Sequence, residues 1–366
     1  MEGGYNDRPP FLFMKALSLF SNVGFGEMYL PKIGIDVVVA NELLKDRSQF
    51  YHHLHPKTKQ VICGDICSNS VKDQIIYACE KLGPIDLVIA TPPCQGMSAA
   101  NALKKPDDPR NTLVVHALSI FKSINAKFML IENVPGMAKT FINQEDEAIN
   151  IIDYINQNIP KGYKCITKPL NAKSYDSPQS RLRSISLISK NGRWKHPKPL
   201  KTISTLRDAI GHLPSLSSGD HSYLPWHFSP KHNPNHIRWM DSTPEGETAF
   251  NNDINYPQKD GRKIKGFMTT YKRMFWDKPA PTVTMNSGSI SSQNNVHPSD
   301  SRVLTIRELL CVCGLPENLL DNFAHLQPDG SYKYDYSPQF IRHVIGEMFL
   351  PQLCLHIMKN IPNLEK

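Results

Sequence analysis

The sequence predicts an α/β fold in the first half of the chain, a parallel sheet with crossover helices. A second, smaller domain that is mostly irregular or β is expected to follow. Two observations predict this division. Up to about residue 131, short β-branched and apolar runs alternate with longer segments of helical period. From about Lys190 to about residue 300, the chain is instead rich in Pro, His, Ser, Asn and Gly and has no clear helix period.

Each predicted strand of the first half ends in small, polar or Pro/Gly residues. In an open α/β sheet, ligands bind beyond the carboxyl ends of the parallel strands. The residues that follow these strands are therefore the first candidates for a functional site. The expected strands are Met14–Phe20, Asp36–Asn41, Gln60–Cys63, Ile85–Ala90 and Lys127–Ile131.

Later segments are expected to complete this first domain. Two further extended runs, Cys165–Asn171 and Ser184–Ile188, could form an antiparallel pair at the edge of the sheet. Helical periodicity returns at Thr305–Cys313 and at Pro338–Met358. We therefore expect one domain of residues 1–190 plus 328–366 and a second domain of residues 191–327.

Composition limits the classes of function. The 366 residues carry a formal net charge of +8, which favours a polyanionic partner such as nucleic acid. The eight cysteines include no Cys-x-x-Cys pair, so free thiols and no metal site are expected. No apolar run reaches about 18 residues, and the N-terminal residues do not resemble a secretory signal. No membrane span is expected, and the cytoplasm is the predicted location.

The most informative segment leads from a strand pattern into Thr91, Pro92, Pro93 and Cys94. The two prolines fix φ and leave Cys94 in a rigid turn. A thiol with a pKa of about 8.5 becomes a good nucleophile when helix N-terminal amides or a cation lower that pKa. A cysteine between a strand end and a helix is well placed for this. The alternative is an inert core cysteine, but core filler does not need two flanking prolines.

Two further segments supply charged groups. Glu132 lies at the tip of the neighbouring predicted strand, where a carboxyl can act as a general acid or hydrogen-bond a ring nitrogen. Arg181 and Arg183 are two residues apart on an extended run, so both project to one face as fixed cations. Taken singly, a solvated acid and surface salt bridges explain these residues equally well.

Together, the three segments resemble a known family. The motifs Pro-Pro-Cys-Gln-Gly-x-Ser, Glu-Asn-Val and Pro-Gln-Ser-Arg-x-Arg occur in the order found in the cytosine-C5 DNA methyltransferases of bacterial restriction–modification systems. The resemblance extends from about residue 14 to 352. It implies an S-adenosylmethionine-dependent methyltransferase fold, with a Rossmann-like sheet and a target-recognition domain. Further matching segments are 20–27, 41–42, 64–66, 108–113, 279–284, 297–298 and 302–308.

The resemblance also implies a mechanism. The Cys94 thiolate would attack C6 of cytosine, which places electron density on C5 for methylation. Glu132 would hydrogen-bond N3 and the exocyclic amine, and Arg183, supported by Arg181, would orient the base through its O2. None of this can occur inside a stacked duplex, so the target cytosine must be flipped out.

S-adenosyl-L-methionine is the methyl donor that the resemblance implies. Gly24 lets the backbone approach a ligand, and Glu42 follows near the offset of about 20 residues at which an acid meets ribose hydroxyls. Asn22 and Phe25 stand where the family usually has glycine, and Glu347 stands where it usually has asparagine. The residues implied to bind the donor are Phe20, Asn22, Gly24, Glu42, Leu43, Asp65, Ile66, Pro92 and Leu113.

Double-stranded DNA is the implied substrate, with 1–190 plus 328–366 as catalytic domain and 191–327 as target-recognition domain. The stretch 261–273 mixes cations with Phe267 and Tyr271 and contains no acid, which suits a phosphate-tracking surface or, equally, a solvated loop. A monomer is expected, with a cognate restriction endonuclease acting separately. The residues expected to contact DNA or the base are Gln95, Ser98, Lys104, Arg262, Lys263, Lys265, Lys272 and Arg273.

Three other functions remain open. A tRNA-methylating member of the family would use the same chemistry, although the long basic segment between Arg183 and Arg302 fits a DNA reader better. A catalytically silent DNA-binding homologue is disfavoured because Cys94, Glu132 and Arg183 are all present. A thiol redox or acyl-transfer enzyme would need a resolving cysteine or an oriented base near Cys94, and the nearby sequence offers neither.

Overall fold

The computed structural model describes residues 13–93, 109–144 and 147–362. These residues fall into two compact units. The first unit lies within 1–170, 182–198 and 354–366, and the second comprises 171–181 and 199–353. Which unit carries catalysis and which reads the substrate stays a prediction. No helix in the described ranges is both long and apolar enough to cross a membrane.

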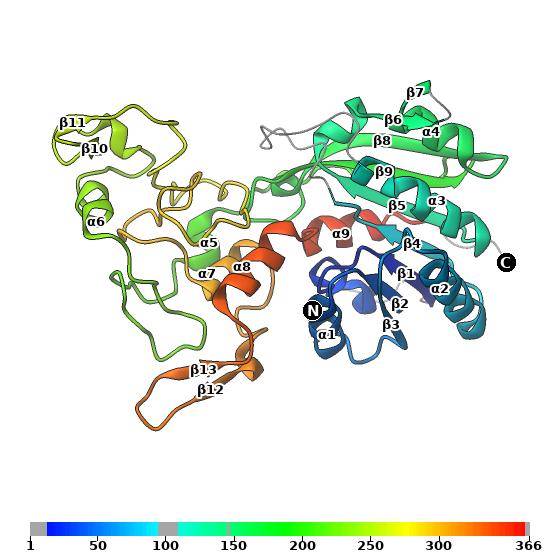
Figure 1. The fold of residues 1–366 in the computed structure, drawn as a ribbon, viewed down its shortest axis with the longest axis horizontal. Helices are drawn as coiled ribbons and strands as arrows, with labels where there is room; N and C mark the ends of the chain where they lie inside the picture. The colour runs from blue at the N-terminus through cyan, green and yellow to red at the C-terminus, as the bar shows by residue number, and fades with distance from the viewer. Residues whose placement is uncertain (1–12, 94–108, 145–146, 363–366) are drawn as a thin grey trace, which may run out of the picture. The chain divides into compact units, whose positions relative to one another are not determined.

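The first unit is built on a seven-stranded sheet with the order β3-β2-β1-β4-β5-β9-β8 (Figure 1). The strands β3, β2, β1, β4 and β5 run parallel, and β9 pairs antiparallel with β5. The predicted α/β fold is confirmed, and each predicted strand is present with small shifts of its ends. The strands are β1 (Met14–Leu19), β2 (Ile35–Glu42), β3 (Gln60–Cys63), β4 (Leu87–Ala90), β5 (Phe128–Asn133), β8 (Tyr163–Asn171) and β9 (Leu182–Lys190), with a separate hairpin of β6 (Phe141–Gln144) and β7 (Glu147–Asn150).

Three helices cover one face of this sheet. Apolar side chains of α2, α3 and α4 form one core with Leu17 and Leu19 of β1 and with Met129 and Ile131 of β5. Because side chains alternate along a strand, Ser18 of β1 and Glu132 of β5 project to the opposite face. The helices of the unit are α1 (Lys45–Leu54), α2 (Asn69–Leu82), α3 (Leu113–Ser123), α4 (Ile151–Asn158) and most of α9 (Pro351–Met358).

The second unit is largely irregular, as the composition of 190–300 predicts, but it contains two helices that the sequence did not predict. Thr205 and Asp208 form a capping box that starts α5, and the Asn233 side chain caps α6 ahead of a proline at its first position. These capping signals were present in the sequence. The elements of the unit are α5 (Leu206–Ile210), α6 (Pro234–Asp241), β10 (Gln258–Lys259), β11 (Arg262–Lys263), α7 (Ile306–Val312), β12 (Ala324–Leu326), β13 (Tyr332–Tyr334) and α8 (Pro338–Glu347) (Figure 1).

The helix predicted over Pro338–Met358 is instead two helices, α8 and α9, separated at Met348. Pro351 explains the break, because proline has no N–H to donate to a preceding turn and its ring clashes there. It is accommodated as the first residue of α9, where the missing donor costs nothing.

Buried charges organise the second unit. Arg302 is fully buried and donates from Nη1 and Nη2 to the two carboxylate oxygens of Glu308, both at 2.8 Å. The same carboxylate accepts the backbone N–H of Thr305 and so caps α7. Burial raises the pKa of the Glu308 carboxyl, but the hydrogen bonds and charge of Arg302 outweigh it and hold that pKa below its usual value. This pair ties an irregular segment to a helix.

Replacing Arg302 by Met should lower the free energy of unfolding by about 3–5 kcal/mol, because Glu308 would stay buried without its cation. The double variant Arg302→Met, Glu308→Leu removes both charges of this pair and should recover part of that loss. Urea denaturation of the two variants measures the difference. Equal losses of unfolding free energy in the single and double variants would show that the unpaired charge of Glu308 does not cause the loss.

Candidate active site

The carboxyl ends of β1, β4 and β5 are joined by side-chain hydrogen bonds. Thr91, just after β4, donates from its hydroxyl to the carbonyl of Phe20 at 2.9 Å. Asn133, the last residue of β5, donates from Nδ2 to the carbonyl of Pro92 at 3.0 Å. Asn133 is buried, so it holds the chain two residues before Cys94 against the end of β5. Cys94, Gln95, Ser98 and Lys104 lie outside the described residues.

Glu132 and Arg183 form an ion pair at this edge of the sheet. Arg183 Nε lies 2.9 Å from Glu132 Oε1, and both side chains are mostly buried. The register explains the contact, because Glu132 pairs with Ile185 and Arg183 lies two residues away on the same face of β9. Two residues that lie about 50 positions apart in the sequence are thus brought together as a fixed acid and a fixed cation.

Arg181 has a different position from Arg183. It is buried in the second unit, where Nη1 donates to the carbonyl of Val283 and Nη2 to that of Gly346, both at 2.9 Å. A Cβ on Gly346 would lie only 2.3 Å from the backbone nitrogen of Met285, so this glycine allows the two segments to meet. Arg181 therefore braces backbone segments of the second unit, and its support of Arg183 in orienting the base stays a prediction.

The turn after β1 has the left-handed conformation that its glycines suggest. Phe20, Asn22 and Gly24 have φ angles of 58°, 51° and 76°. Asparagine tolerates this region better than most residues, so Asn22 in place of the usual glycine preserves the turn. Phe25, the other departure, is buried.

Glu42, at the end of β2, is fixed against this turn. Its carboxylate accepts the backbone N–H of Asn22 at 2.9 Å and that of Leu44 at 3.0 Å. Burial raises the pKa of the Glu42 carboxyl, although the backbone N–H groups of Leu44 and Asn22 and the charge of Arg47 oppose that rise. A third backbone N–H, that of Leu43, also hydrogen-bonds this carboxylate, which has about four acceptor sites in all and so could still accept a ligand hydroxyl.

The remaining residues predicted to bind the donor follow β2, β3 and β4 or begin α3. Leu43 is 60% exposed, which leaves an apolar surface beside Glu42. The Asp65 carboxylate accepts the N–H of Cys67 at 2.9 Å, and Ile66 beside it is buried. Pro92 is buried and Leu113 is partly buried at the start of α3, while Glu347 is exposed at the end of α8.

Three residues beneath the first turn were missed by the sequence interpretation, and two of them contact Glu27, which belongs to the matching segment 20–27. Ser18 and Tyr51 both donate to the buried carboxyl of Glu27, and His55 contacts the carbonyl of Gly24 through Nε2 at 3.0 Å. Ser18 lies on β1, Tyr51 on α1 and His55 directly after α1, while Glu27 ends the short helix that follows the turn. No periodicity or motif in the sequence places them together.

The basic stretch of the second unit is exposed along residues 261–269. Arg262 and Lys263 form β11, Lys265 follows, and Phe267 is 81% exposed among them. The Lys263 ammonium donates to the carbonyl of Asn252 at 2.9 Å, so one of its N–H donors is already engaged within the protein. Lys272 is only partly exposed.

Arg273 does not belong to this surface. It is 5% exposed, and its guanidinium donates to the backbone carbonyls of Met240, Thr243 and His297 at 2.8 to 2.9 Å. A side chain so engaged has no free face for a phosphate. The expectation that Arg273 contacts DNA is therefore not carried forward.

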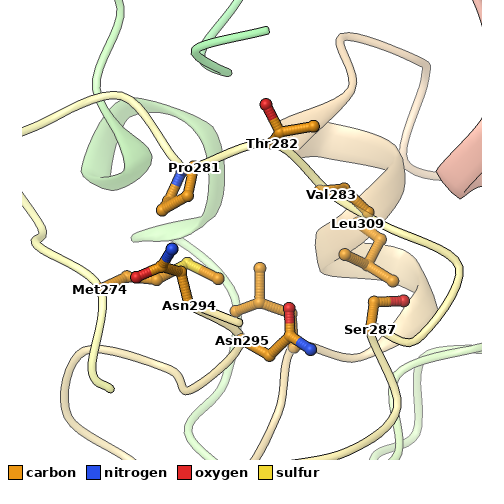
Figure 2. Close-up of a pocket in the computed structure, with 9 residues that line it drawn as sticks. Met274, Pro281, Thr282, Val283, Ser287, Asn294, Asn295 and Leu309 are labelled. Atoms are coloured by element: carbon orange, nitrogen blue, oxygen red, sulfur yellow. The ribbon is translucent and has the colours of Figure 1, made fainter. Parts of the chain in front are cut away.

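None of the predicted site residues is among those that line a small cavity in the second unit (Figure 2). Its volume of about 10 Å³ holds one water molecule rather than a substrate. Thr282, Ser287, Asn294 and Asn295 give it a polar lining suited to such a water. Among the described residues, no group of three or more His, Cys, Asp or Glu side chains could hold a metal ion.

Comparison with known proteins explains this arrangement. A sequence profile described as C-5 cytosine-specific DNA methylase matches residues 14–363. The chain belongs to the C-5 cytosine-specific DNA methylase family. The resemblance inferred from three short motifs is thus confirmed, and so is the predicted enzyme class, DNA (cytosine-5-)-methyltransferase.

Several members of this family are similar over most of the chain. Type II methyltransferase M1.HgaI of Avibacterium volantium is 38% identical over 95% of this chain and 98% of its own length. Type II methyltransferase M.NgoPII of Neisseria gonorrhoeae is 35% identical over 87% of this chain and 90% of its own. The structure of the methyltransferase EhMeth of Entamoeba histolytica has a TM-score of 0.61 at 15% identity, covering 95% of this chain and 97% of its own, and supports the fold alone.

Asn133 provides a test of the link between strand ends. Asn133→Asp keeps an oxygen for the N–H of Val134 but replaces the donor to Pro92 by an acceptor that repels that carbonyl. Methyl transfer should fall roughly 10- to 100-fold, because a shift of the chain before Cys94 would misplace the predicted nucleophile. Stability should fall by only about 1–3 kcal/mol. Paired rate and thermal-unfolding measurements check this, and unchanged methyl transfer would contradict the proposed link.

Proposed function

We propose that this enzyme transfers a methyl group from S-adenosyl-L-methionine to C5 of a flipped-out cytosine within one short sequence of double-stranded DNA. The observation that carries the proposal is the Glu132–Arg183 ion pair, held at the strand end beside the residues that lead to Cys94. A fixed acid and a fixed cation near a thiol are the groups that this chemistry needs.

The residues around the first turn fit the donor. Left-handed backbone at Asn22 and Gly24, the carboxylate of Glu42 and the exposed apolar surface of Leu43 suit a ligand with an amino acid part, a ribose and an adenine. S-adenosyl-L-methionine supplies an electrophilic methyl group when bound. Phe20, Asp65, Ile66, Pro92 and Leu113 are proposed to complete the site.

Cys94 would act as the nucleophile. Its thiolate forms a bond to C6 of the cytosine, and the C5–C6 π electrons move so that C5 becomes nucleophilic. After C5 gains the methyl group, a base removes the C5 proton and the Cys94–C6 bond breaks, which restores the aromatic ring. The chain contributes the thiol, the electrostatic environment and a pocket that receives the flipped base.

Glu132 and Arg183 would bind the Watson–Crick edge of that base. The carboxyl of Glu132 hydrogen-bonds N3 and the exocyclic amine, and so stabilises the charge that develops on the ring. Arg183 keeps Glu132 in place and has further N–H donors for the O2 of the base. Their pairing before substrate arrives reduces the reorganisation needed in the transition state.

The biological role we infer is DNA modification beside a cognate restriction endonuclease that acts separately. The support is the similarity to enzymes named Type II methyltransferases. Double-stranded DNA is the proposed substrate, with Gln95, Ser98 and Lys104 near the base and Arg262, Lys263, Lys265 and Lys272 on the phosphates. A cytoplasmic monomer stays a prediction.

Bisulfite sequencing of DNA from a methylation-free bacterial host that expresses the chain tests this function. We expect protected cytosines in one short sequence context, and none with Cys94→Ala, because the control lacks the nucleophile. Soluble, folded protein without protected cytosines would rule out an active DNA enzyme and would direct attention to RNA.

The exposed cations allow a second test, on DNA affinity. Arg262→Ala and Lys265→Ala should each reduce the slope of log affinity against log salt by about 0.9 if each side chain neutralises one phosphate. Lys81→Ala is the matched control, because the last turn of α2 leads to the amino end of β4, away from the site. Fluorescence anisotropy with a short duplex measures the slopes. Equal slopes for all four proteins would remove this stretch from the DNA surface.

A further inference from the structure

A buried carboxyl lies beneath the proposed donor-binding turn and has no role in the mechanism above. Glu27 follows the turn directly and is 6% exposed. Ser18 of β1 donates its hydroxyl to Oε1, and Tyr51 of α1 donates its hydroxyl to Oε2 at 2.5 Å. The carboxyl is thus held between a strand and a helix at the base of the turn.

His55, the residue directly after α1, contacts the turn at a second point. His55 Nε2 lies 3.0 Å from the carbonyl of Gly24, and the His55 ring packs against that of Tyr51 with centroids 4.6 Å apart. Burial lowers the pKa of His55 to about 4, so the ring is neutral and donates the Nε2 proton to the carbonyl. A Cβ on Gly24 would lie 2.3 Å from His55 Nε2, which shows that the His55 ring packs directly against the turn at Gly24.

The electrostatic surroundings of Glu27 are unusual. Burial raises its pKa to about 7, although the hydrogen bonds from Ser18 and Tyr51 lower it in part. Among the described residues, Tyr51 on α1 and the buried thiol of Cys354 on α9 are titratable groups that interact with Glu27. Burial, and then the charges of Glu27 and Glu132, raise the pKa of the Cys354 thiol. No lysine or arginine among the described residues forms an ion pair with Glu27. Near neutral pH this carboxyl is therefore poised between a neutral and an ionised form.

We propose that Glu27 is a positioning residue that makes the donor site select a cationic ligand, S-adenosylmethionine, over the uncharged-sulfur product, S-adenosylhomocysteine. The inference rests on the donor proposed above. The two ligands differ by one methyl group and by the positive charge of the sulfonium. A buried carboxylate under the turn attracts the positive charge of the sulfonium strongly, because the environment has a low dielectric constant. It has no such attraction for the uncharged sulfur of the product.

The linkage between donor binding and ionisation of Glu27 determines how donor affinity should change with pH. A cation that binds near Glu27 favours its ionised form, so donor binding should release a proton and should strengthen as the pH rises through about 7. A downward shift of one unit in the pKa of Glu27 corresponds to a tenfold gain in donor affinity at high pH. The product carries no such charge and should lack this gain.

Two variants separate charge from packing. Glu27→Gln keeps the size of the side chain and can still hydrogen-bond Ser18 and Tyr51, but it cannot ionise. Tyr51→Phe removes one of the bonds that lower the pKa of Glu27, so it should move the pH dependence to higher pH. Glu80→Gln, an exposed position on α2, is the matched control for the loss of one negative charge.

Calorimetric titration of the full chain with each ligand, at about pH 6 and about pH 8, tests the proposal. In the wild type and in Glu80→Gln, preference for the donor over the product should increase about 3- to 10-fold with pH. In Glu27→Gln that increase should be absent. Titration of the ligands' own amino groups is common to all the proteins and cancels in the comparison.

Thermal unfolding without ligand supplies a second readout. Because the pKa of Glu27 is higher in the fold than its ordinary value of 4.5, the wild type should lose stability as the pH rises from there through about 7. Glu27→Gln lacks this loss, so its unfolding temperature should exceed that of the wild type at pH 8 and not at pH 5.

The outcomes distinguish this inference from the function on which it rests. If Glu27→Gln keeps the wild-type increase in donor preference, or Tyr51→Phe leaves its pH midpoint unchanged, the selective role of Glu27 is wrong while the donor assignment stands. If neither ligand binds the wild type at either pH, the donor assignment fails and the inference fails with it.

Discussion

The candidate site depends on the hydrogen bonds that join the carboxyl ends of neighbouring parallel strands. Ser21 donates its N–H to Asn41, Thr91 donates to Phe20, and Asn133 donates to Pro92. Each bond is local, but together they make one connected edge from β2 to β5. Side chains that follow these strands inherit fixed positions from the sheet core beneath them, and a catalytic group is useful only when its position is fixed.

Three buried glutamates show how surroundings decide what a carboxyl does. Glu308 is paired with Arg302 and serves the packing of the second unit. Glu132 is paired with Arg183 at the edge of the sheet, where we propose that both groups bind the target base. Glu27 has hydroxyl partners instead of a cation, and its raised pKa follows from that difference. The same residue type therefore has three different surroundings in one chain, and we propose a different role for each: stability for Glu308, substrate recognition for Glu132 and charge selection for Glu27.

The sequence predicted the sheet and the family well, because strand periodicity and three short motifs are local signals. It also placed Glu132 and Arg183 at strand ends, although their contact depends on a register that the sequence does not state. The sequence failed where contacts are long-range: the support of the turn by Glu27, Tyr51 and His55 joins three elements. Arg273 looked like a surface cation, and only the structure revealed that backbone carbonyls surround it.

Trapping with DNA that carries 5-fluorocytosine at the target position tests the central claim most directly, that Cys94 forms a covalent bond to a base held by Glu132 and Arg183. Fluorine at C5 cannot leave as a proton does, so the methylated adduct should persist. We predict a denaturant-resistant protein–DNA complex whose cross-linked peptide contains Cys94, with slower formation in Glu132→Gln. Methylation of ordinary DNA by the wild type without any trapped complex, or a cross-link at another residue, would contradict the account.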